Sequence, residues 1–151
     1  MFGLSAKLRK QGSPIAAYQK FQSFVAALAN KIHNFSSDVL TIALCATANA
    51  PVATNTQLSN LTQIAYTNLS TRVVSTTSSL QTAGTYKYIA ADLVLTASGA
   101  VAAFQYVVLY NDTATNDELV GWWDYGSSVT LANTDTFTID FDNTNGVFQL
   151  A

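Results

Sequence analysis

Charged side chains are the scarcest group in this sequence of 151 residues, of which only 11% are Asp, Glu, Lys or Arg. That share is about half of what soluble domains usually carry. Thr and Ser are abundant instead, so we expect a surface rich in hydroxyl groups. Burying a hydroxyl costs less free energy than burying a charge, and such a surface therefore favours β structure with extensive contacts to neighbouring chains.

Cysteine and histidine occur once each, at Cys45 and His33. A lone cysteine excludes an intramolecular disulfide, and Cys45 ends the apolar run VLTIALC, where a buried, inert thiol is expected. His33 lies near the end of a predicted helix without a nucleophile at a recognisable spacing, which favours a surface position or a role at the helix C-terminus over that of a base. The motifs HExxH, CxxC and GxSxG and a glycine-rich phosphate loop do not occur. We therefore expect no catalytic residue, no metal site and no cofactor.

Long apolar runs are missing as well, and none approaches the length of a membrane span. The start of the chain resembles a secretory signal superficially, because Lys7, Arg9 and Lys10 precede the apolar segment FVAALA. Polar residues from Gln19 to Ser23 interrupt that stretch, and the same residues suit an amphipathic helix better. We expect neither a cleaved signal nor a membrane contact.

The few charges are distributed unevenly along the chain. Five of the seven basic residues lie in the first 31 positions, and seven of the nine acidic residues lie between Asp112 and Asp142. The net charge of -2 argues against nucleic acid as a partner. A basic leading end could attract acidic groups within one chain or between copies, and the alternative is a solvated basic tail.

Periodicity divides the chain into an arm, a helix and a series of strands. Residues 1–14 contain Gly, Ser and Pro among basic and apolar residues, which indicates an extended arm that becomes ordered on another surface. Apolar residues then recur at steps of three and four, which predicts an amphipathic helix over about residues 15–34. The remaining chain consists of segments rich in β-branched and aromatic residues, with a spacing of roughly 8–12 residues. The predicted strands are VLTIALC, STRVVSTTSSLQ, TYKYIAADLVLTASG, VAAFQYVVLYN, LVGWWDYG, SSVTLA, TFTIDF and VFQLA. The sequence therefore predicts one domain over residues 15–151, an antiparallel β-sandwich of jelly-roll-like or Ig-like type with one N-terminal helix.

Two polar segments have the composition of metal-binding loops. In DFDNTNG, Asp140 and Asp142 resemble the opening of an EF-hand, but the glycine stands one position late and the final carboxylate is missing. Asn145-Gly146 is a turn dipeptide, so we expect a hairpin that joins TFTIDF to VFQL, with an adventitious cation site as the alternative. The segment NDTATNDE, residues 111–118, is expected to be a plain turn, with a binding edge as the alternative.

Aromatic residues form the third candidate group, around Trp122, Trp123 and Tyr125. Neighbouring residues of a strand face opposite sides, so one Trp can enter the core while the other needs a cover. Trp and Tyr are frequent anchors of protein interfaces, which favours contact with another subunit. Intramolecular packing and stacking on a sugar are the alternatives. The candidate partner-binding residues are Lys7, Arg9, Lys10, Trp122, Trp123 and Tyr125.

Three stretches carry a resemblance to a known family. They are the run from YQKFQSFVAALANKIHNF to LTQIAYTNL, the segment YVVLYNDTATNDELVGWWDYGSS and the ending DFDNTNGVFQLA. With them, residues 17–151 resemble the small virion structural proteins of tailed bacteriophages. The leading segment MFGLSAKLRKQGSP looks like an addition to the family's usual start. The resemblance supplies no enzymatic residues and implies a component of the particle.

Within that class, the resemblance favours a head decoration (cement) protein. Such a protein would be made in the cytoplasm of the bacterial host and would bind the outer surface of the capsid in the virion. It would bridge neighbouring capsomers through the major capsid protein and copies of itself, with trimers at three-fold positions as one arrangement. Many weak contacts repeated by symmetry would hold it through avidity. A tail or neck component and a host-glycan binding module stay open as alternatives.

Overall fold

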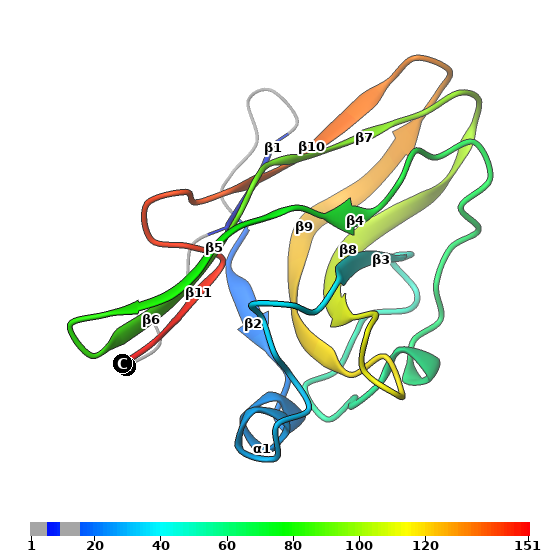
Figure 1. Ribbon diagram of the computed structural model, residues 1–151. Helices are drawn as coiled ribbons and strands as arrows, with labels where there is room; N and C mark the ends of the chain where they lie inside the picture. Colours follow the sequence, from blue (N-terminus) through cyan, green and yellow to red (C-terminus); the bar gives the residue numbers. More distant parts are fainter. Residues whose placement is uncertain (1–5, 10–15) are drawn as a thin grey trace.

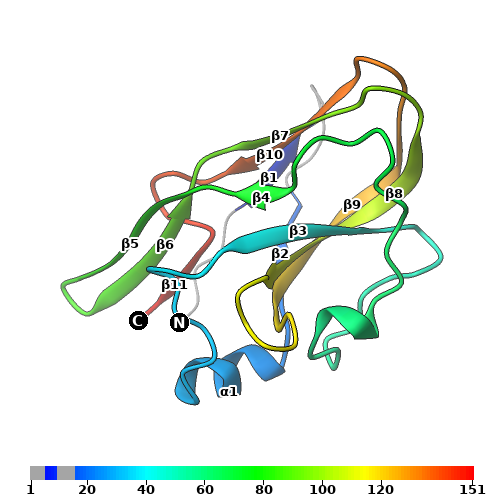
Figure 2. The same ribbon diagram turned by 45° about the vertical axis from the view of Figure 1, so that its right-hand side comes forward.

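The computed structural model describes residues 6–9 and 16–151, and antiparallel strands are its main element (Figures 1 and 2). The elements are β1 (Ala6–Arg9), β2 (Tyr18–Lys20), α1 (Ser23–Ala29), β3 (Leu40–Cys45), a 3-10 helix (Leu58–Asn60), β4 (Val73–Val74), β5 (Thr76–Thr82), β6 (Thr85–Ala90), β7 (Leu93–Thr96), β8 (Val101–Asn111), β9 (Leu119–Leu131), β10 (Thr136–Phe141) and β11 (Phe148–Leu150). The mainly β, antiparallel part of the predicted fold class is confirmed.

The strands form three sheets. The largest has the order β2-β9-β8-β3-β4, and the two smaller ones have the orders β1-β10-β7 and β11-β6-β5. The long hairpin of β8 and β9 curves through the centre of the molecule in Figure 1. Both of its strands alternate branched or aromatic residues, which favours extended backbone with two packed faces.

The main core lies on one face of the five-stranded sheet and includes residues of both smaller sheets. From β3, Leu40, Ile42 and Leu44 point into it, and all three are fully buried. Phe137 of β10 and Phe148 of β11 reach the same cluster from the smaller sheets. Successive side chains of a strand point to opposite faces of the sheet, so the residues of β3 between these three face the other side.

A second, smaller cluster covers the opposite face of the five-stranded sheet. Ala43 and Cys45 of β3 and Val108 of β8 are fully buried there. Partly buried side chains of the loop after β3, Leu58 and Leu61, pack against them. Because both faces of β3 are covered, its whole sequence is apolar apart from Thr41, and the expected burial of Cys45 is confirmed.

The predicted helix over residues 15–34 is too long. Only Ser23–Ala29 are helical, and Tyr18–Lys20 form β2, which pairs with β9. Tyr18 and Phe21 have a helical spacing, yet Tyr18 belongs to a strand and its ring lies over Gly121, where a Cβ atom would overlap it. Tertiary packing on β9 thus overrides the local pattern.

Three further strand predictions differ from the structure. TFTIDF and VFQL do not form a hairpin, because β10 pairs with β7 and β1 while β11 pairs with β6. The segment TYKYIAADLVLTASG is not one strand but two, β6 and β7, which belong to different sheets. Conversely, LVGWWDYG and SSVTLA are one strand, β9, in which Gly126 has a φ of 84°.

The predicted arm, residues 1–14, lies mostly outside the described residues. Its described part, Ala6–Arg9, forms β1. β1 pairs with the chain's own β10, with Ala6 opposite Phe141 and Arg9 opposite Thr138.

Candidate functional site

Two of the three aromatic candidates are core residues in this structure. Trp123 has no exposed surface, and its ring meets that of Tyr18 at 5.3 Å between centroids in an edge-on contact. Tyr125 is 9% exposed and packs edge-on against Phe137. Both side chains point from β9 into the main core, so the prediction that they bind a partner is corrected to a role in packing.

The third aromatic candidate, Trp122, lies on the opposite face of β9 and is half-buried. The ring of Phe21 covers it at 4.4 Å between centroids. Phe21 is fully buried and stands just before α1, at the end of a segment distant in sequence. Packing within the chain, which was the alternative to a subunit contact, therefore covers much of the surface of the Trp122 side chain.

The basic candidates stand at the leading end of the chain. Lys7 and Arg9 belong to β1, and the backbone register places Lys7 opposite Asp140 of β10. Lys10 lies outside the described residues. The described part of the leading segment therefore pairs with β10, a strand of the acidic C-terminal part of the chain.

The segment after β10 is a turn that uses its own carboxylate. Asp142 Oδ1 accepts the backbone N–H groups of Thr144 and Asn145 at 2.8 and 2.7 Å, and Asn145 Nδ2 donates to Oδ2 at 2.9 Å. Gly146 adopts a φ of 84°, which an L-residue rarely tolerates. Turn geometry thus explains the acidic pattern, and within the described residues no group of three or more His, Cys, Asp or Glu could hold a metal.

His33 is part of a buried polar network that the sequence did not reveal. Its Nδ1 accepts a hydrogen bond from Asn111 Nδ2 at 3.1 Å, and the same amide nitrogen donates to Asp38 Oδ2 at 2.6 Å. Asn111 Oδ1 accepts the N–H groups of Thr113 and Ala114. The network ties the loop after α1 to the turn between β8 and β9.

The surroundings of His33 fix it as a neutral structural residue. The side chain is 7% exposed and its ring packs beside those of Phe24 and Phe35, and burial lowers its pKa although Glu118 and Asp38 act in the opposite direction. Because Asn111 uses its carbonyl on two backbone groups, its NH2 must face Nδ1, which therefore carries no proton. The prediction of a surface or helix-end position is wrong, since α1 ends at Ala29 and His33 packs in the interior.

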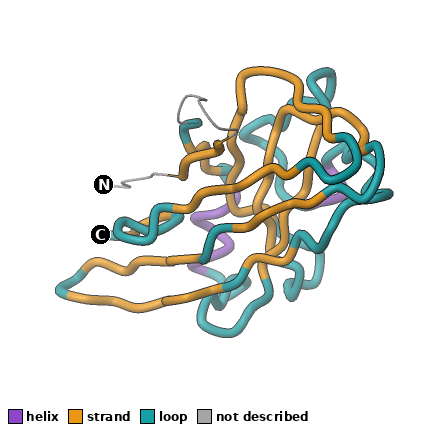
Figure 3. Tube along the Cα trace, turned by 90° about the horizontal axis from the view of Figure 1, so that it is seen from above, coloured by secondary structure: helices purple, strands orange, loops and turns teal. Residues whose placement is uncertain are grey.

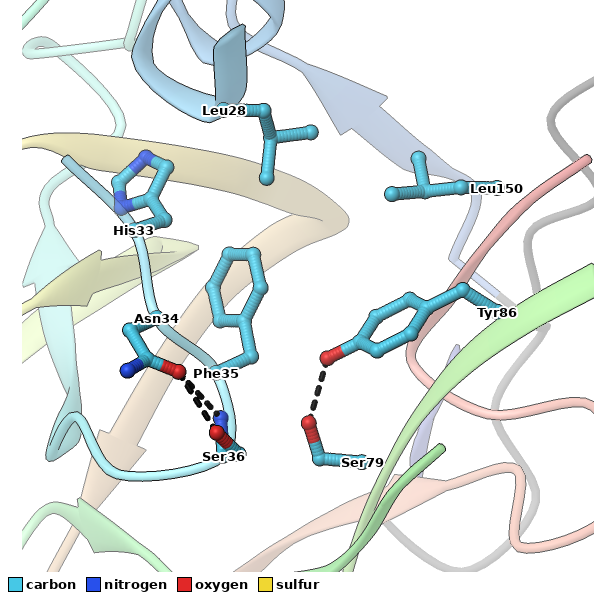
Figure 4. A pocket seen from close by; sticks show the side chains of 8 residues that line it. All are labelled: Leu28, His33, Asn34, Phe35, Ser36, Ser79, Tyr86 and Leu150. Atoms are coloured by element: carbon cyan, nitrogen blue, oxygen red, sulfur yellow. Dashed lines mark hydrogen bonds between the residues drawn. The ribbon is translucent and has the colours of Figure 1, made fainter. Parts of the chain in front are cut away.

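An open pocket of about 290 Å³ lies beside this network (Figure 4). Leu28, Phe35, Tyr86 and Leu150 supply its apolar walls, while serine and asparagine side chains supply its polar ones. Ser36 Oγ donates to Asn34 Oδ1 at 2.6 Å, and the Ser79 and Tyr86 hydroxyls bond to each other. The polar groups are therefore engaged with one another, and none forms a nucleophile–base pair.

The thiol of Cys45 is also unsuited to nucleophilic chemistry in this fold. It is fully buried in the second cluster, and burial raises its pKa to about 11. A thiol needs a lowered pKa to be a thiolate at neutral pH, so the environment of Cys45 acts against reactivity.

The most exposed apolar side chain belongs to a different region, the ribbon of β5 and β6. This ribbon is the hairpin of residues 76–90, which projects from the body in Figures 1 and 3, with β11 paired to β6 on its inner side. Leu80 of β5 is 68% exposed, and Lys87 is the only charged residue of the ribbon. The ribbon is therefore the candidate interaction surface, and the sequence prediction missed it because hydroxyl residues carry no distinctive motif.

A scan against protein-family models finds no match, and searches of curated proteins and of solved structures find none either. No helix among the described residues has the length and apolar character needed to cross a membrane. The function of the chain has to be inferred from its own sequence and geometry.

Proposed function

We propose that this chain is a structural protein of a bacteriophage virion, and within it a decoration (cement) protein that binds the outer surface of the capsid and bridges neighbouring capsomers. The observation that carries the proposal is the combination of a body whose central sheet is covered on both faces with a projecting ribbon in which Lys87 is the single charged residue. Such a body is stiff, and such a ribbon can contact neighbours at little cost in desolvation. The resemblance of residues 17–151 to small phage structural proteins supports the same role.

The finer fold proposed for this role is a β-sandwich of jelly-roll-like or Ig-like type. The five-stranded sheet would be one layer, and the two three-stranded sheets would together be the other. The main cluster supports this, because it draws side chains from all three sheets. A sandwich of this kind resists deformation, which suits a protein that braces a shell.

The basic leading segment is the proposed contact with the major capsid protein. Lys7, Arg9 and Lys10 would meet acidic groups of the capsid surface, where repetition over many copies would provide avidity. Replacing all three with Glu is expected to lower the occupancy of particles and to reduce its dependence on salt. An unchanged occupancy in competition with the parent chain would remove these residues from the account.

Binding to shells tests the proposed function directly. Purified chain should co-sediment with empty, expanded capsids prepared without it, and should saturate at a fixed ratio to the major capsid protein. Labelled chain seen at the neck or tail of intact particles would assign the tail or neck alternative instead. Binding to a carbohydrate array without any binding to particles would support the host-glycan alternative and overturn the structural role.

A further inference from the structure

The edge strands of the three sheets differ sharply in length. Among the described residues, five of the six edges are short: β1 and β7 have four residues each, β2 and β11 have three and β4 has two. β5 is the exception, with seven residues. Proteins usually keep edges short or protect them with charges and proline, because an exposed edge pairs with other strands.

β5 lacks each of these protections. Its sequence TTSSLQT contains no charge and no proline, and Leu80 exposes 68% of its surface near the tip of the ribbon. Figure 3 shows the ribbon standing away from the body. In the part of the chain that the structure describes, β6 is the only strand that pairs with β5.

The turn of the ribbon determines which backbone groups face outward. Ala83 and Gly84 have positive φ angles of 50° and 86°, as in a two-residue type I′ turn. In an antiparallel ladder, hydrogen-bonded and non-hydrogen-bonded residue pairs alternate. The pair that flanks such a turn, Thr82 and Thr85, is hydrogen-bonded, and so is the pair of Leu80 and Lys87. Ser79 and Gln81 between them therefore direct their N–H and C=O groups away from β6.

We propose that β5 pairs with β5 of a second copy of this chain, antiparallel and across a two-fold axis at Ser79. The outward groups of each Ser79 meet those of the other, and Gln81 of one copy lies opposite Thr77 of its partner, where the pairing of β5 with β6 is irregular between Thr76 and Ser78. The β11-β6-β5 sheets of the two copies then join into one sheet of six strands. This inference deepens the proposed function by naming one partner of the ribbon, and the pairing itself can be measured without any virus particle.

Charge is the reason to favour a second copy over an unrelated strand. A two-fold axis brings the residues next to it close to their own counterparts, so a charge near the centre of the strand would oppose a like charge. β5 is neutral along its whole length, and the only charge of the ribbon, Lys87, reaches away to Thr144 O at 3.1 Å. At the proposed register the two Leu80 side chains lie diagonally across the axis on the same face, within reach of each other.

Substitution of Leu80 tests the pairing on the full chain in solution. The parent is expected to be a concentration-dependent dimer in sedimentation equilibrium. Leu80→Lys should raise the dissociation constant by at least about tenfold, or about 1.4 kcal/mol, because two ammonium groups would face each other. The matched control is Val52→Lys, which adds the same charge at a loop position that is 53% exposed. Far-ultraviolet circular dichroism and thermal unfolding should show that both variants fold like the parent.

Two further variants make the test specific for this register. Gln81→Pro removes an outward N–H that β6 does not use, so it should block the dimer and leave the ribbon intact. A mixture of Leu80→Lys and Leu80→Asp should restore a dimer, since opposite charges then meet across the axis. A parent that is a monomer at every soluble concentration, a trimer, or a dimer indifferent to Leu80→Lys would overturn the proposal, as would a mixture that stays monomeric.

The pairing and the virion role can fail separately. A chain that dimerises through β5 but is absent from purified particles refutes the decoration role alone. A chain that occupies capsids with unchanged stoichiometry as a monomer refutes the pairing alone.

Discussion

His33 should make the stability of the chain sensitive to mild acid. Burial lowers its pKa in the folded state below the usual value of about 6.5, so the unfolded chain binds a proton first as the pH falls. The free energy of unfolding should therefore be highest above about pH 6.5 and decrease as the pH falls through the folded-state pKa. Urea unfolding at several pH values between 7.5 and 5 measures this. Since His33 is the only histidine, His33→Gln should flatten the profile near neutrality, and a profile unchanged by that substitution would contradict the argument.

Gly121 is the residue whose lack of a side chain permits the contact between β2 and β9. A Cβ atom at this position would overlap the ring of Tyr18, whose hydroxyl donates to Val120 O at 3.3 Å. Gly121→Ala should lower the free energy of unfolding by about 1–3 kcal/mol, the usual cost of overpacking. Gly84→Ala is the contrasting case, because a Cβ there meets no atom within 4 Å and any cost comes from the φ of 86° alone. Calorimetric unfolding of both variants measures these effects. If Gly121→Ala were as stable as the parent, β2 could move away from β9 at no cost in free energy.

At the scale of elements, β1 should stabilise the sheet to which it belongs. It covers one edge of β10 over four residue pairs, so deleting residues 1–14 exposes backbone groups that were paired. The β body is expected to stay folded, with the free energy of unfolding lowered by about 2 kcal/mol, and the uncovered edge should favour aggregation. Replacing Lys7, Arg9 and Lys10 with Ala keeps the backbone of β1 and separates its pairing from its charge. Equal stability of the deletion and the parent in denaturant titrations would show that β1 contributes nothing to the fold.

The elements also show where sequence patterns suffice. β8 and β10 were predicted at the bounds found here, because their β-branched and aromatic residues and their flanking turn residues indicate strands locally. The division between β6 and β7 was missed, since nothing local indicates that Ala91 and Asp92 lead from one sheet to another. The role of Asn111 was missed for a similar reason: its partners His33 and Asp38 lie more than 70 positions away. The same limit applies to the candidate site, because Phe21 covers Trp122 only in the folded chain.

For the molecule as a whole, burial should set a gradient of stability from the central sheet to the ribbon. β3 and the middle of β8 are covered on both faces. The side chains of β5 are exposed or half-buried, and no strand in the described part of the chain pairs with its outer edge. Amide hydrogens of Ile42, Leu44 and Val107 should exchange only through global unfolding. Those of Ser79 and Gln81 should exchange orders of magnitude faster in the dilute monomer, because no strand in the described part of the chain accepts them.

Dimerisation should change this pattern at one edge only. Raising the protein concentration should slow the exchange of the Ser79 and Gln81 amides, since the second copy accepts their hydrogen bonds, and should leave β3 and β8 unchanged. Hydrogen exchange followed by nuclear magnetic resonance resolves both groups in one experiment, and Leu80→Lys is the matched control at the same concentrations. If protection rose equally in the variant, the stiffening would come from another contact and β5 would be an edge open to solvent in every state of the protein.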